Sequence, residues 1–173
     1  MCKMVHLIKT NEVADLSRPI SGHIDDKKIN TYIRESEDID LKSSLGDVLL
    51  MDIRSNPEKY DDLLNGGEYE DKCGYKHTFS GLKRALAYYS YARIVKNNDI
   101  NVTRFGVTFK DDDYSDKVSV KERILAYNDA FSIADKYLHE CVLFLSENKD
   151  KYPLYRGIGK VKANRIKFRT IGD

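Results

Sequence analysis

The sequence predicts a mainly α-helical protein: a helical bundle with one long helix and a small β-hairpin element, followed by an extended basic C-terminal tail. Three observations predict this class. Apolar residues recur at helical spacing over most of residues 25–149, two short stretches alternate as strands do, and segment 151–173 holds seven Lys or Arg but a single acidic residue. We therefore expect one helical domain at residues 1–150 and a tail at residues 151–173.

Composition and charge separate these two parts. The chain has 173 residues, 41% of them hydrophobic, which is enough for one domain with a real core. The totals are 29 basic and 28 acidic residues, and without the tail's seven and one the body keeps 22 basic against 27 acidic residues. No apolar run approaches the roughly 20 residues that span a bilayer, and no signal peptide opens the chain. With three cysteines far apart, these features indicate a soluble intracellular protein without a disulfide framework.

Two helices are predicted in the first third of the chain. The first begins at Asp25 or Asp26, and the second covers residues 40–56 and ends before Pro57. Pro57 then opens a short helical piece that the Gly66-Gly67 pair stops. The predicted apolar face of the first helix holds Ile29, Tyr32, Ile33 and Ser36, and that of the second holds Leu41, Leu45, Val48, Leu49 and Asp52.

The middle of the chain combines strand-like and helical stretches. Residues 68–79, "EYEDKCGYKHTF", alternate aromatic and polar side chains and predict a small hairpin. Residues 80–98 predict a helix with Ser80 as a possible cap, because apolar side chains recur there at helical spacing. Residues 104–117 predict a second β-like piece, which ends at the acidic turn Asp111, Asp112 and Asp113.

The strongest local signal is a capping box, Ser119 followed by Glu122, which predicts the start of the longest helix. That helix runs from Val120 to about Lys149, with no Pro or Gly inside it. Its predicted apolar face holds Ile124, Tyr127, Phe131, Ala134, Leu138, Cys141 and Leu145. A rod of about 43 Å is longer than a body of this size needs, so we expect part of it to contact another molecule.

Patterns for metal, cofactor or catalytic sites are weak. Cys73 and His77 are spaced as half of a zinc site, but no second ligand pair follows, and His139 and Cys141 would point to different faces of one helix. The acidic run 111–113 lacks the alternating oxygens of a calcium loop, and "RGIGK" at 156–160 lacks the spacing of a phosphate-binding loop. We therefore expect no metal, no cofactor and no enzymatic activity.

Three segments resemble a known family. They are residues 24–53, residues 60–119 and the capped long helix, with "FSGLK" at 79–83, "YYSYAR" at 88–93 and "DYSDKVS" at 113–119 as the most specific parts. Over residues 7–148 the chain resembles the head-to-tail connector, or adaptor ring, proteins of tailed phages, especially crAss-like and related phages and prophages. The resemblance lies in whole segments and contains no catalytic signature.

The resemblance implies a structural virion protein of the phage neck, assembled in the host bacterial cytoplasm. It implies a homo-oligomeric ring, with twelve copies as the expected number, that docks on the portal protein and presents the next neck or tail ring. DNA would pass through its channel without sequence-specific binding, and no membrane is involved. Tyr88, Tyr91 and Tyr114 are the candidate inter-subunit residues, because Tyr88, Tyr89 and Tyr91 cover more helix faces than one core stripe needs and Tyr114 lies in a predicted axial-contact loop, 105–118.

The basic tail is expected to dock on a neighbouring acidic protein surface, on the portal or an adjacent connector subunit, as a strand or as a helix. Its candidate docking residues are Tyr155, Arg156, Lys160, Lys162, Arg165, Ile166, Lys167, Phe168, Arg169 and Ile171. The alternative function is a small nucleic-acid-binding protein whose tail neutralises phosphates. The acidic body argues against that alternative, because it would repel a duplex.

Overall fold

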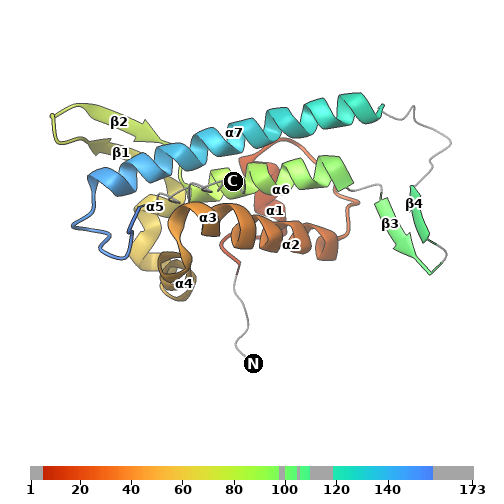
Figure 1. The fold of residues 1–173 in the computed structure, drawn as a ribbon, viewed down its shortest axis with the longest axis horizontal. Helices are drawn as coiled ribbons and strands as arrows, with labels where there is room; N and C mark the ends of the chain where they lie inside the picture. The colour runs from red at the N-terminus through yellow and green to blue at the C-terminus, as the bar shows by residue number, and fades with distance from the viewer. Residues whose placement is uncertain (1–5, 98–99, 105, 110–118, 158–173) are drawn as a thin grey trace, which may run out of the picture.

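The computed structural model confirms a mainly helical fold with small antiparallel hairpins (Figure 1). It describes residues 6–97, 100–104, 106–109 and 119–157. The first half contains α1 (Thr10–Leu16), α2 (Asp26–Glu35), the π-helical η1 (Ser36–Leu41), α3 (Lys42–Leu45), α4 (Asp47–Ser55), the 3-10 helix η2 (Pro57–Tyr60) and α5 (Asp61–Asn65). The second half contains β1 (Gly67–Glu70), β2 (Lys76–Phe79), α6 (Leu82–Asn97), β3 (Ile100–Thr103), β4 (Gly106–Phe109) and α7 (Val120–Glu147).

Helix α7 lies along α6, and α1, α2, η1 and α5 also pack against α6 (Figure 1). The hairpin β1–β2 pairs Gly67 with Phe79 and packs near the C-terminal end of α7. The hairpin β3–β4 follows the C-terminal end of α6, at the opposite end of the body (Figure 1). The predicted small hairpin is thus confirmed, and strand β4 lies within the predicted second β piece.

Helical structure runs without interruption from Asp26 to Leu45 and breaks at Gly46. Asp25 caps its start by accepting a hydrogen bond from the Lys27 backbone nitrogen at 2.9 Å. The prediction of one helix over residues 40–56 is therefore wrong. Gly46 has a φ of +81°, which glycine adopts without strain, and the chain turns there.

The turn at Gly46 also changes which side chains of α4 are buried. Leu49, Leu50 and Ile53 face the core, whereas Val48, predicted for the apolar stripe, is 57% exposed. The predicted apolar stripe continued across Gly46 as if residues 40–56 formed one straight helix. Because the chain changes direction at Gly46, the buried face of α4 is a different one. The face predicted for the first helix is correct, since Ile29, Ile33 and Ser36 are buried and Tyr32 packs on the core.

The predicted cap at Ser80 is replaced by a different contact. The residue directly before α6 is Gly81, whose carbonyl accepts from the Ala85 nitrogen at 3.4 Å. The Ser80 backbone nitrogen instead donates to Glu140 of α7 at 3.0 Å. This bond ties the start of α6 to α7.

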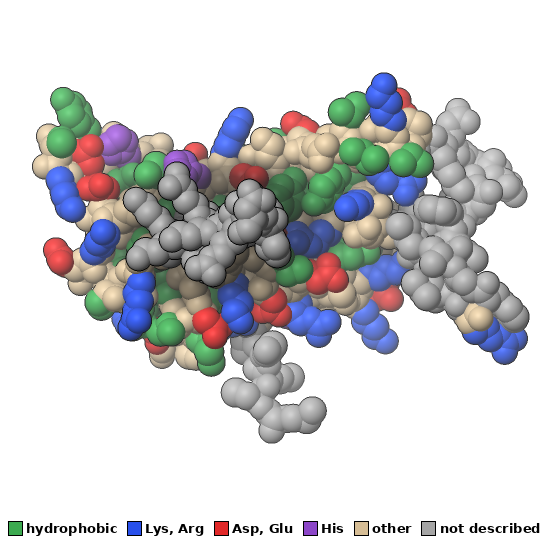
Figure 2. Space-filling view, viewed as in Figure 1, with side chains coloured by type: hydrophobic (Ala, Val, Ile, Leu, Met, Phe, Trp, Pro, Cys, Tyr) green, Lys and Arg blue, Asp and Glu red, His purple; other side chains and the backbone are tan. Residues whose placement is uncertain are grey.

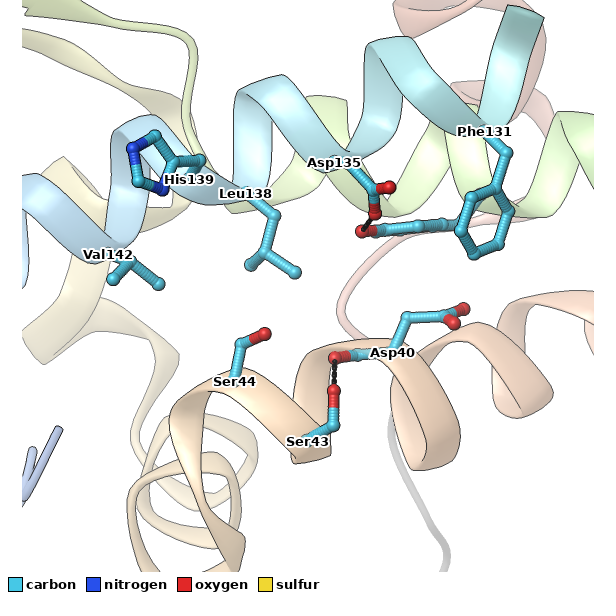
Figure 3. Close-up of a pocket in the computed structure, with 9 residues that line it drawn as sticks. Asp40, Ser43, Ser44, Phe131, Asp135, Leu138, His139 and Val142 are labelled. Carbon is cyan, nitrogen blue, oxygen red and sulfur yellow. Dashed lines mark hydrogen bonds between the residues drawn. The ribbon is translucent and has the colours of Figure 1, made fainter. Parts of the chain in front are cut away.

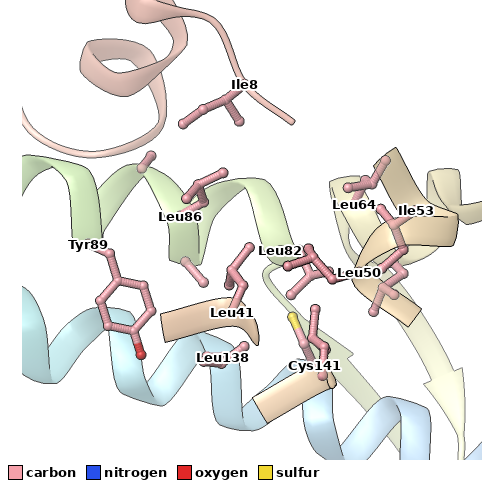
Figure 4. Close-up of a cluster of buried hydrophobic side chains, with 14 of the residues drawn as sticks. Ile8, Leu41, Leu50, Ile53, Leu64, Leu82, Leu86, Tyr89, Leu138 and Cys141 are labelled. Carbon is pink, nitrogen blue, oxygen red and sulfur yellow. The ribbon is translucent and has the colours of Figure 1, made fainter. Parts of the chain in front are cut away.

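The core lies between α6, α7 and the helices of the first half (Figure 4). Leu82, Leu86 and Tyr89 of α6 meet Leu138 and Cys141 of α7 there. The predicted capping box of Ser119 and Glu122 is present at the start of α7, so the longest predicted helix is confirmed. Among the described residues, no helix is long and apolar enough to cross a membrane.

Candidate interaction site

Tyr88 and Tyr91 of α6 are half-buried and pack against the edge of the core. The Tyr88 ring meets the Tyr137 ring of α7 edge-on at 5.5 Å between centroids. Tyr89 is the buried member of the cluster, as expected for a core residue. The two predicted interface tyrosines therefore present only part of each ring to a partner.

The other predicted interface residue, Tyr114, and the docking residues from Lys160 to Ile171 lie outside the described residues. The start of the predicted tail is described, and it differs from the prediction. Tyr152 and Tyr155 are both buried in the core, and Lys151 Nζ lies 2.5 Å from Asp62 of α5. Tyr155 is a core residue and not an exposed docking side chain, whereas Arg156 is exposed.

The start of the predicted tail is held on the body by aromatic packing, which sequence periodicity does not reveal. The Tyr152 ring stacks on Tyr60 of η2 at 5.8 Å and meets Phe144 of α7 edge-on at 5.6 Å. These contacts fold the chain back onto the body directly after α7. The predicted tail therefore belongs to the body at least as far as Tyr155.

The residues considered for zinc do not converge. His77 Nε2 lies 3.0 Å from Asp71 Oδ2 across the β1–β2 turn, and Cys73 is exposed nearby. On α7, His139 is exposed and Cys141 is buried, as their spacing predicted. Within the described part of the chain, no group of three or more His, Cys, Asp or Glu side chains is placed to hold a metal ion.

A groove of about 460 Å³ lies between α7 and the η1–α3 segment (Figure 3). Asp40, Ser43 and Ser44 form one wall, and the α7 side chains of the other wall approach from the opposite side (Figure 3). The α7 wall holds Phe131, Asp135, Leu138, His139 and Val142 (Figure 3), and Tyr89 of α6 also lines the groove. The groove thus combines two carboxylates and the hydroxyls of two serines and a tyrosine with an apolar wall.

Two hydrogen-bonded or ion-paired contacts fix the carboxylates. Tyr89 Oη donates to Asp135 Oδ1 at 2.5 Å, and burial together with this bond raises the pKa of the Tyr89 phenol. Arg93 Nη1 lies 2.7 Å from Asp40 Oδ2, but the contact is not aligned as a hydrogen bond, and this buried oxygen accepts none from the described residues. Burial raises the pKa of Asp40, and Arg93 offsets part of that rise.

The charge of the groove differs from that of three other cavities. Its wall contains Asp40 and Asp135 and no Lys or Arg among the described residues. The cavities beside β2, beside η2 and beside the β1–β2 hairpin each have at least one Lys or Arg in the wall, namely Lys83, Arg54 and Lys151. The groove is therefore suited to a ligand that is both basic and apolar.

Sequence reasoning did not find this groove. Asp40 and Asp135 are 95 positions apart and meet only because α7 packs against α3 and α6. One signal was available: Asp135 directly follows Ala134, which the sequence placed on the apolar face of the long helix. A carboxylate at the border of an apolar face is typical of a polar contact with a neighbouring element.

The N-terminal end of α7 presents a second surface. Val120, Ile124 and Leu125 are 70%, 49% and 58% exposed. Figure 2 shows hydrophobic side chains on the surface at this end of α7. Ile124 was predicted for the apolar face of the helix. At this end of α7, that face is exposed and does not pack on the body.

The comparisons with known proteins give a family and no named relative. No curated protein matches the chain, and no solved structure matches it. Residues 41–165, well over half of the sequence, match the model described as "Family of unknown function (DUF6712)". The chain therefore belongs to the family DUF6712.

Proposed function

We propose that this protein is a structural virion protein, a head-to-tail connector ring subunit. In this role it docks on the portal protein, extends the DNA channel and joins the capsid to the tail. The proposal begins from the resemblance of residues 7–148 to adaptor ring proteins. Its localisation is then the neck of the virion, with assembly in the host bacterial cytoplasm.

The observation that carries the proposal is the exposed apolar end of α7. A 28-residue helix is packed on the core from Ala130 onward, while Val120, Ile124 and Leu125 at its N-terminal end are exposed. Isolated exposed apolar residues are common, but three within six positions of one helix form a continuous surface suited to a neighbour. A ring subunit needs such a surface, because it contacts a neighbouring copy on each side.

The test is assembly on the portal protein encoded by the same genome. Changing Leu125→Asp is expected to weaken ring formation at least tenfold, because a carboxylate would have to be buried in the contact. Leu143→Asp is the matched control, since Leu143 is an exposed leucine near the other end of the same helix. Equal assembly of the Leu125→Asp and wild-type proteins would contradict the proposal for this surface.

The predicted tyrosine contacts are tested in the same assay. Tyr88→Asp and Tyr91→Asp are each expected to weaken association without unfolding the subunit, because both side chains are only half-buried. Thermal unfolding checks the second condition. If neither change affects assembly on the portal, these tyrosines serve the edge of the core and not the subunit contact.

The second candidate function is nucleic-acid binding by the tail, favoured by the five Lys or Arg residues after Gly157. A chain ending at Gly157 separates the two functions, because it removes these cations and keeps Tyr152 and Tyr155 in the core. DNA binding that falls steeply with salt and vanishes on this truncation, with no assembly of the full-length chain on the portal, would favour the second function.

A further inference from the structure

The acidic groove and the basic C-terminal segment are complementary in chemistry. The groove offers Asp40 and Asp135 together with Phe131, Leu138 and Val142. Segment 158–173 offers Lys160, Lys162, Arg165, Lys167 and Arg169, interleaved with Val161, Ile166, Phe168 and Ile171. One chain therefore contains both an acidic groove with an apolar wall and a basic segment with apolar side chains that could fill it.

The groove has the charge that such a segment needs. Its described wall contains no Lys or Arg, and the buried Oδ2 of Asp40, whose side chain is 9% exposed, forms an ion pair with Arg93 at 2.7 Å. Asp40 shares the single positive charge of Arg93 with Glu35, which lies 3.6 Å from the same guanidinium. One negative charge of this pair of acids therefore remains. A cationic side chain entering the groove would gain charge-assisted contacts there.

The groove also has an apolar wall of matching length. From Phe131 to Val142 the α7 wall extends about 16 Å, and the 16 residues after Gly157 reach about 50 Å when extended. Apolar anchors such as Phe168 would supply most of the affinity, because each exposed ion pair contributes little. The charges would set orientation and specificity.

We infer that the groove between η1–α3 and α7 is the acceptor for segment 158–173 of an adjacent copy of this chain. This inference rests on the proposed function, in which neighbouring copies lie side by side in a ring. It selects the adjacent subunit, and not the portal, as the surface on which the tail docks. Each copy would then hold one neighbour's tail and give its own to the next, a heterologous contact.

The inference is tested with two full-length variants that each lack one half of the contact. The groove variant carries Ser43→Lys and His139→Lys, which add positive charge at exposed wall positions without touching the core. The tail variant has its five cations after Gly157 replaced by Glu. Each variant alone is expected to lose the tail contact, whereas a mixture restores one intact groove and one intact tail.

The expected result is a one-to-one pair in the mixture, measured by native mass spectrometry and sedimentation velocity. Neither variant alone should form this pair. If the mixture remained two separate species, segment 158–173 would not bind this groove, and this would overturn the inference. A groove variant that still pairs with itself as wild type does would also overturn it.

Matched controls separate a groove effect from general charge. Ser55→Lys is the control for Ser43→Lys, because both serines are exposed and donate to a carbonyl of their own helical segment, Met51 and Asp40 respectively. His139→Glu should strengthen binding of a synthetic peptide 158–173 by a few fold, whereas His139→Lys should weaken it by about tenfold. Equal binding by the His139→Glu and His139→Lys proteins would count against the groove.

Failure of this inference and failure of the connector function give different results. Rings that form on the portal without any pairing in the two-variant mixture would leave the connector function standing and overturn the groove contact. Pairing in the mixture without assembly on the portal would support the groove contact and overturn the connector function.

Discussion

Glu37 of η1 is a carboxylate with 1% of its side chain exposed, and three groups satisfy it. Arg54 Nη2 of α4 donates to it at 2.7 Å, the Leu7 backbone nitrogen donates at 2.7 Å, and His6 Nδ1 lies 3.4 Å away. A single buried residue thereby holds the N-terminal segment and α4 to the same point of η1. Because a buried charge is costly without its partner, this contact is expected to be sensitive to substitution.

Arg54→Met should lower the free energy of unfolding by about 3 kcal/mol, because it leaves Glu37 buried without its cation. Urea denaturation measures the change. Lys42→Met is the control, since Lys42 pairs with Asp47 at 2.9 Å but both side chains are largely exposed, and its effect should stay below about 1 kcal/mol. Similar losses in both variants would mean that the burial of Glu37 does not matter.

Cys141 of α7 predicts a pH dependence of stability. Burial raises the pKa of the Cys141 thiol to about 12, from a reference value of 9.0. The thiol in the unfolded chain therefore loses its proton first, so the contribution of Cys141 is complete below pH 9 and is lost as the pH rises from 9 toward 12.

At pH 10 the wild-type protein should have lost about 1.4 kcal/mol through Cys141 relative to pH 8. Cys141→Ala should show a correspondingly shallower decline over this interval, whatever its stability at pH 8. The control is Cys73→Ala, because Cys73 is exposed and its removal should leave the decline unchanged. Parallel pH profiles for all three proteins would be incompatible with a buried neutral Cys141.

At the scale of elements, the close approach of two glycines organises the region between α5 and α6. A Cβ on Gly81 would lie 2.5 Å from the Gly66 nitrogen, and a Cβ on Gly66 would lie 2.5 Å from the Phe79 carbonyl oxygen. Both contacts are with backbone atoms, which cannot move aside as side-chain ends do. Gly46 has a similar positive φ but open space around it.

Gly81→Ala and Gly46→Ala therefore form a matched pair. Both replace a glycine with φ near +80°, so both should lose about 1 to 3 kcal/mol from backbone strain. Gly81→Ala should lose several kcal/mol in total, because the added methyl group must separate α5 from α6. Thermal unfolding of the two variants compares them, and equal melting temperatures would refute the close-approach argument.

Element prediction from the sequence worked where the signals were local. The Ser119–Glu122 box and the unbroken apolar spacing placed α7 correctly, since both depend on residues within a few positions of one another. Gly46 was visible in the sequence, but its effect on α4 depends on how the chain turns, and Val48 was therefore assigned to the wrong side. Ser80 failed as a cap because a distant residue, Glu140, binds its backbone.

For the whole molecule, the limit of sequence prediction is distance along the chain. The acidic groove joins η1 and α3 to α7, and the core includes Tyr152 against Tyr60, 92 positions away. The mainly helical class follows from spacing, but such pairings follow only from packing. The predicted boundary at residue 150 shows the same limit: charge marked the start of the tail, but Tyr152, Leu154 and Tyr155 pack on the body.

Two truncations check this boundary. A chain ending at Gly157 should unfold at nearly the wild-type temperature, because it keeps the described core intact. A chain ending at Asn148 removes buried Tyr152 and Tyr155 and should lose at least about 3 kcal/mol of stability. Equal stability of the two truncated chains would place these tyrosines outside the core.

The central claim is that this chain forms a ring on a portal vertex, and its most direct measurement is particle mass and symmetry. Native mass spectrometry and electron microscopy would be applied to the purified protein alone and mixed with the portal protein of the same genome. The account predicts a closed ring, with twelve copies as the expected number, seated coaxially on the portal. A protein that stays monomeric in both samples, with no mass added to the portal, would contradict it.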